Sequence, residues 1–173
     1  MYFTYMETFI KILAVVGSIE TIVLIVGLIW AFALWIRGIS PALLRLGNGL
    51  AKRKIAIFAK NGNMSSLKRL LMDSKLFSEK NICEITKKED IGIAEQATLY
   101  LVFWHDCADY IDDVLRKKPD ACALIVYAPR NLGPIPEDQM KNLDGHRHTA
   151  VTNFRGRLLN DIVTAMITTS YEK

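Results

Sequence analysis

The chain has 173 residues, of which 51% are hydrophobic, and a formal net charge of +4 at pH 7. This length accommodates one modest domain plus one further element. Residues 51–173 carry 19 basic and 16 acidic side chains, a balance too mild for a protein that binds duplex nucleic acid generally. The three cysteines have no CxxC spacing, which argues against a disulfide framework or a zinc site and suits a reducing cytoplasm.

Residues 12–36 form an apolar segment in which Glu20 is the only formal charge. About 20 apolar helical residues cross a hydrocarbon core of ~30 Å, so the segment predicts a transmembrane helix. A buried core helix would present a polar side to water, and this segment has none. A cleaved signal peptide would begin with basic residues and end at a small-residue cleavage site, and neither is present here.

Basic residues are concentrated after the apolar segment, whereas Lys11 is the only one before it. Positive charge flanks the cytoplasmic end of a span, so we expect a single pass with the C-terminal domain in the cytoplasm. The expected organisation is an extracytoplasmic N-terminus (1–11), a transmembrane helix (12–36), a juxtamembrane linker (37–50) and a cytoplasmic α/β domain (51–173). In the linker, Ser40-Pro41 predicts the start of a short helix and the GNG sequence at 47–49 predicts its end.

After residue 50, apolar strand patterns alternate with helical patterns. We expect strands at 54–59, 81–86, 98–104, 121–128 and 149–154. Helices are expected at 63–74, with Ser65 or Ser66 as N-cap, and at 89–97, 106–118, 136–144 and 156–171. This alternation predicts a Rossmann-like or TIR-like α/β fold, a five-stranded parallel sheet sandwiched between helices.

Ligands of open parallel sheets bind beyond the carboxyl ends of the strands. The residues expected at that rim are Lys60, Asn61, Arg130, Asn153, Arg155 and Arg157. Arginine suits bidentate phosphate contacts, and Tyr127 and Phe154 could stack on bases if they point outward. The rim therefore predicts a pocket for a nucleotide or a short single-stranded oligonucleotide; the alternative is a set of ordinary surface arginines.

Enzymatic interpretations find less support. A receiver domain would place a phospho-acceptor at Asp106, but it also needs an acidic pair after the first strand, where this chain has AKNGN. A TIR-type NAD hydrolase needs a glutamate, for which Glu89 and Glu95 are available, but nothing local marks either one. A dinucleotide-binding fold is not indicated, because the GxGxxG fingerprint is absent. His146 and His148 lack a nearby third ligand, which favours an exposed loop over a metal site. We expect no catalytic residue, metal or cofactor.

Glu20 shares one stripe of the predicted span with Leu24, Gly27 and Ala31. Small residues four apart permit close helix approach, and a carboxylate inside a membrane normally faces a bundle interior or water. Because one span cannot supply that interior, we expect a homo-oligomer, a tetramer being favoured, with these four residues lining a pore. The alternative is that Glu20 lies near the outer headgroups and reaches water there.

Three stretches, RGISPALLRLGNGLAKRK, KIAIFAK and NFRGRLLNDIVTAMITTSYEK, resemble small membrane effectors of bacterial anti-phage signalling systems, most of all the membrane effector of the Hailong system. The resemblance covers the whole chain and implies an oligomeric ion channel in the bacterial inner membrane. It implies gating by a nucleotide messenger such as oligodeoxyadenylate, made by a nucleotidyltransferase encoded nearby, and depolarisation with growth arrest when the channel opens. CRISPR-associated effectors with CARF sensors look similar, so the sign of gating stays open. A membrane-anchored TIR-like NAD hydrolase and a tethered interaction module remain alternatives.

Overall fold

The computed structural model describes residues 2–51 and 53–169, with side chains of the first helix described at Met6 and at 13–38. The chain divides into two units, Met1–Arg45 and Leu46–Lys173. The first consists of helix α1 (Tyr2–Ala51), which continues into the second unit. Within α1, Leu13–Gly38 is long and apolar enough to cross a membrane by length and composition.

The linker prediction was wrong in one respect. Helix α1 runs without interruption through Ser40-Pro41 and through residues 47–49 to Ala51. Each interior glycine costs a helix only about 1 kcal/mol, and an established helix extends without a new nucleation cost. The glycines at 47–49 therefore did not stop a helix that was already long, and Pro41 did not stop it either, although an interior proline costs about 3 kcal/mol.

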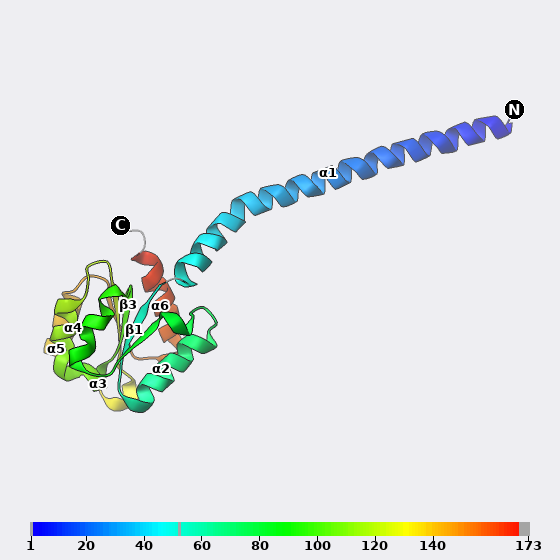
Figure 1. Ribbon diagram of the computed structural model, residues 1–173. Helices are drawn as coiled ribbons and strands as arrows, with labels where there is room; N and C mark the ends of the chain where they lie inside the picture. Colours follow the sequence, from blue (N-terminus) through cyan, green and yellow to red (C-terminus); the bar gives the residue numbers. More distant parts are fainter. Residues whose placement is uncertain (1, 52, 170–173) are drawn as a thin grey trace. The chain divides into compact units, whose positions relative to one another are not determined.

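The second unit is an α/β domain with a five-stranded, wholly parallel sheet in the order β2-β1-β3-β4-β5 (Figure 1). Its strands are β1 (Ile55–Phe58), β2 (Ile82–Ile85), β3 (Leu99–Phe103), β4 (Ala123–Tyr127) and β5 (Thr149–Thr152). In register, Ile55 of β1 lies between Ile82 and Leu99. All five lie inside the predicted ranges, and the fold class is confirmed as α/β with a parallel sheet.

The helices of this domain are α2 (Asn61–Asp73), α3 (Trp104–Cys107), α4 (Ile111–Lys117), α5 (Glu137–Asp144) and α6 (Arg155–Thr168), and the 3₁₀ helices are η1 (Glu79–Asn81), η2 (Lys88–Gln96), η3 (Ala108–Tyr110) and η4 (Arg130–Leu132). The helix expected at 89–97 is thus the 3₁₀ helix η2, and the one expected at 106–118 is divided into three short pieces. Helix α2 begins earlier than predicted: its N-cap is Lys60, not Ser65 or Ser66.

Side chains of alternate strand positions build two cores, one on each face of the sheet. Phe58 and Tyr100 belong to the core covered by η2, α3, α4 and α5. Ile57 and Leu101 belong to the core covered by α2 and α6. The central strands β1, β3 and β4 are buried throughout, as expected for strands covered on both faces. Arg53, which precedes β1, also contacts α6: its guanidinium donates a hydrogen bond to the Met166 carbonyl.

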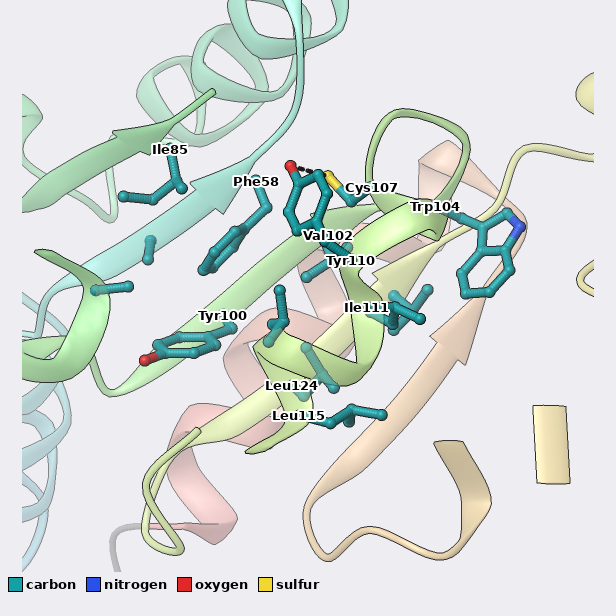
Figure 2. Packing of buried hydrophobic residues seen from close by; sticks show 14 of the residues in the cluster. Phe58, Ile85, Tyr100, Val102, Trp104, Cys107, Tyr110, Ile111, Leu115 and Leu124 are labelled. Atoms are coloured by element: carbon teal, nitrogen blue, oxygen red, sulfur yellow. Dashed lines mark hydrogen bonds between the residues drawn. The ribbon is translucent and has the colours of Figure 1, made fainter. Parts of the chain in front are cut away.

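Two tyrosines in the first core differ in how their hydroxyls are satisfied (Figure 2). The Tyr110 hydroxyl donates to the Cys107 thiol at 3.1 Å. The buried Tyr100 hydroxyl has no hydrogen-bond partner among the described residues. Burial raises the pKa of both phenols, so both stay neutral at ordinary pH.

This difference predicts opposite effects of the same substitution. Tyr110→Phe should lower the free energy of unfolding by about 1 kcal/mol, because a hydrogen bond is lost. Tyr100→Phe should leave it unchanged or raise it, because only an unpaired buried hydroxyl is removed. Denaturant titration of the two variants beside the wild type measures both values, and a larger loss for Tyr100→Phe would contradict the prediction.

Candidate functional site

Every side chain described from 13 to 38 in α1 is exposed. The two hydroxyls of this stretch bond to the helix itself: Ser18 Oγ donates to the Ala14 carbonyl at 2.7 Å, and Thr21 Oγ1 donates to the Gly17 carbonyl at 2.8 Å. These contacts satisfy polar groups that water would otherwise have to satisfy. Glu20, also exposed, is the one carboxylate between them.

The predicted stripe is compatible with the observed helix. Leu24, Gly27 and Ala31 follow Glu20 by four, seven and eleven positions in an uninterrupted helix, spacings that place all four residues on one face. Apart from its chain neighbours and the backbone of its own helix, no atom lies within 4 Å of where a Cβ on Gly27 would stand. The face is therefore open, with its smallest residues near the middle of the apolar stretch.

In the α/β domain, the chain passes from β1 to one side to form β2 and then returns to the other side to form β3, β4 and β5. Ligands of such sheets bind at this switch point, between the carboxyl ends of β1 and β3. The Asp106 carboxylate of α3 lies at this point. Its Oδ2 accepts from the Lys60 backbone N–H at 2.7 Å and from Asn63 Nδ2 at 3.0 Å. The chain's own carboxylate thus caps α2 and occupies the position that favours an anion.

The four predicted cations at the rim are all exposed, but three of them have protein partners. The Arg130 guanidinium lies over the Phe154 ring, 4.3 Å from its centroid. Arg155 donates to the Ser66 carbonyl of α2 at 2.9 Å. Arg157 pairs with Asp161 at 3.1 Å, one turn along α6. Lys60 extends from the N-cap of α2.

The structure does not bring Arg155 and Arg157 into one pocket. Arg155 lines a hollow of about 190 Å³ between α2 and the loop after β4, with Phe103, Tyr127 and Leu132 among its other lining residues. Arg157 lines a separate hollow of about 290 Å³ between β5 and α6. Ligand pockets commonly measure roughly 300–1,000 Å³, so the first hollow holds only part of a nucleotide. Asn61 and Asn153 are exposed and line neither hollow.

The two aromatic candidates also differ. Tyr127 is 6% exposed and packs edge-on against Phe103, with ring centroids 5.7 Å apart. Its ring contributes a wall to the smaller hollow but does not project from the rim. Phe154 is 52% exposed, and Arg130 covers one face of its ring. Of the two rings, only that of Phe154 is exposed, as stacking on a base requires.

The residues weighed for catalysis lie in different parts of the α/β domain. Glu89 and Glu95 are exposed on η2, and Glu95 lies near the starts of β1 and β2, beside Lys54 and Ile82. Burial raises the pKa of Cys107 to about 11 and that of Cys122 to about 12, so neither thiol is a nucleophile at neutral pH. Among the described residues, no three metal-ligating side chains gather.

The sequence reasoning placed Asp106 at the rim only as a phospho-acceptor and missed its part in holding α2. A signal was available: residues 60–63 offer no acidic side chain to the start of α2. Because β1 and β3 are neighbours in the sheet, the segment after β3, which contains Asp106, lies beside the segment after β1. No protein-family model, curated protein or solved structure matches the chain.

Replacing Asp106 with alanine should free the start of α2. Because the carboxylate bonds a backbone N–H and a side-chain amide, we expect the free energy of unfolding to fall by about 1 kcal/mol, as for a lost N-cap. Asp109→Ala, a neighbouring exposed acid on η3, is the matched control and should change little. Equal stability of both variants in denaturant titration would contradict the capping role.

Proposed function

We propose that this protein is an oligomeric ion channel of the bacterial inner membrane, and that a nucleotide messenger bound to its cytoplasmic α/β domain controls it. Opening would depolarise the cell and arrest growth as a defence against phage. The observation that carries the proposal is a helix exposed on all sides from 13 to 38, with Glu20 as the one carboxylate among its apolar side chains.

Apolar side chains on every side of α1 favour a lipid environment over water. The self-satisfied hydroxyls of Ser18 and Thr21 support the same environment. In lipid, a charged Glu20 costs several kcal/mol unless it faces water or a polar partner. Copies of α1 gathered around the Glu20, Leu24, Gly27 and Ala31 face would supply a water-filled interior, and the resulting ring of acids favours cations.

The α/β domain supplies a site for the messenger. The 2-1-3-4-5 strand order is that of the flavodoxin-like group of doubly wound folds and agrees with the Rossmann-like or TIR-like description. Lys60, Arg130 and Arg155 come from the carboxyl ends of three different strands or the loops that follow them. Exposed cations beside one exposed aromatic, Phe154, suit a phosphate chain that carries bases. The basic flank of α1 favours placing this domain in the cytoplasm.

The pore role of Glu20 is tested by ion flux. Full-length protein in liposomes should dissipate a potassium gradient, and Glu20→Gln should lower that flux about tenfold or more, because the charged ring that concentrates cations is removed. A voltage-sensitive dye reports the flux. Growth arrest on expression should weaken in parallel.

Glu20→Asp keeps the charge and is the matched control, so it should retain most of the flux. Circular dichroism establishes that both variants keep their helix. Wild-type flux in Glu20→Gln would contradict the pore role, and a strictly monomeric protein in detergent would favour the alternative of a tethered module.

The messenger site is tested by fluorescence anisotropy with labelled oligodeoxyadenylate. Arg155→Glu and Arg130→Glu should each weaken binding about tenfold or more and flatten its salt dependence, because each removes a cation near phosphate. Lys117→Glu is the charge-matched control, because Lys117 is exposed and lies on α4, which packs against the other face of the sheet.

Equal losses of affinity in all three variants would mean that the overall positive charge of the domain attracts the oligonucleotide, without a specific site. Unchanged binding in Arg155→Glu and Arg130→Glu would place the site elsewhere. Consumption of NAD by the purified protein would instead establish the enzymatic alternative.

A further inference from the structure

Strand β5 forms an open edge of the sheet. Within the described part of the chain it pairs with β4 alone. The carbonyls of His148 and Thr152 accept from β4, from Leu124 N at 2.8 Å and Ala128 N at 2.9 Å. Because backbone groups of a strand point to alternate sides, the N–H and C=O groups of Thr149 and Val151 point away from β4.

The other edge of the sheet is differently built. Strand β2 carries Glu84, which pairs with Lys68 at 2.9 Å, and Lys68 also pairs with Glu79 at 2.8 Å. A charged side chain on an edge strand discourages pairing with another strand. Strand β5 consists of Thr-Ala-Val-Thr and has neither charge nor proline, so it lacks these protections.

A shallow hollow of about 290 Å³ accompanies the open edge. Most of its lining is small and uncharged, from β5 and from the outer side of α6, and it includes Ala150, Thr164 and Ala165. Ala150 is exposed. The charged exception is the Arg157–Asp161 pair, in which Asp161 keeps 16% of its side chain exposed.

We propose that the β5 edge binds the β5 edge of a second copy of this chain, antiparallel and about a two-fold axis, which joins two sheets into one of ten strands. Centring the axis on Ala150 pairs Thr149 of each copy with Val151 of the other. These are the two residues whose backbone groups face outward, so both outward residues of each strand obtain partners. A two-fold contact needs only one self-complementary surface.

The charges near the edge fit this symmetry. Arg157 precedes Asp161 along α6, and a two-fold axis reverses that order in the second copy. Arg157 and Asp161 of the two copies then run in opposite directions across the axis, so opposite charges, not like charges, approach each other between copies. A parallel arrangement would place like charges together, which is unfavourable. The inference does not require the membrane function, because it concerns the α/β domain alone.

The test is disulfide crosslinking of the full-length protein in detergent. In the proposed contact, Ala150 faces its own copy at a non-hydrogen-bonded position, where Cα atoms lie about 4.5 Å apart, within the range that a disulfide accepts. Ala150→Cys in a Cys83→Ser background should give a covalent dimer on mild oxidation. The unaltered chain is the matched control, because its half-buried Cys83 lies on the opposite edge and should not crosslink.

Charge variants of the Ala150→Cys protein distinguish contacts between copies from contacts within one. Arg157→Asp alone and Asp161→Arg alone should each lose most of the crosslink, because like charges then meet across the axis. An equal mixture of the two, carrying tags of different mass, should recover it as a mixed dimer, since opposite charges meet again.

Three outcomes would overturn the proposal. In the first, the native mass shows an oligomer but Ala150→Cys gives no crosslink. This result would exclude the β5 contact and would not contradict the channel proposal. The second is undiminished crosslinking in both single charge variants. The third is crosslinking that appears only after residues 170–173 are deleted, which would assign the edge to the chain's own C-terminus.

Discussion

The apolar surface of residues 13–38, exposed on every side, is the constraint from which the rest of the molecule follows. At roughly 25 cal/mol per Å², such a surface is too costly to leave in water, and no described contact of the chain covers it. Lipid can cover the aliphatic sides, but lipid alone does not accommodate Glu20. Under the proposed function, lipid outside and identical helices inside would satisfy both requirements, and assembly would then be part of the structure of α1.

Asp106 plays a comparable role in the α/β domain. By bonding to Lys60 and Asn63, it connects the start of α2 to α3. It also places a negative charge in the position where a phosphate would be most favourable. A phosphate-bearing ligand that reached the start of α2 would therefore have to displace Asp106 or bind beside it.

The sequence predicted the elements that depend on local apolar pattern. The central strands are continuous apolar runs, and such runs are buried whatever surrounds them. It failed where a distant residue contributes: the N-cap of α2 is Lys60, whose N–H bonds to Asp106, more than forty positions later. It also failed at residues 47–49, where helix continuity outweighed two glycines. Tyr127 could not be oriented, because a shift of one position turns a strand side chain to the other face.

The rim was predicted as one set of cations, yet helical geometry separates two of them. Arg155 and Arg157 are two positions apart at the start of α6, which turns their side chains by about 200°. Arg155 consequently contacts α2 through Ser66, while Arg157 reaches the hollow beside β5. Helix α6 therefore joins the proposed messenger site to the proposed contact between copies. Under the two proposals, a messenger that contacts Arg155 would bind to the same helix that places Arg157 beside the β5 edge. Any coupling through this helix is reciprocal: a messenger that strengthens pairing between copies must itself bind paired copies more tightly, and one that weakens pairing must bind them less tightly.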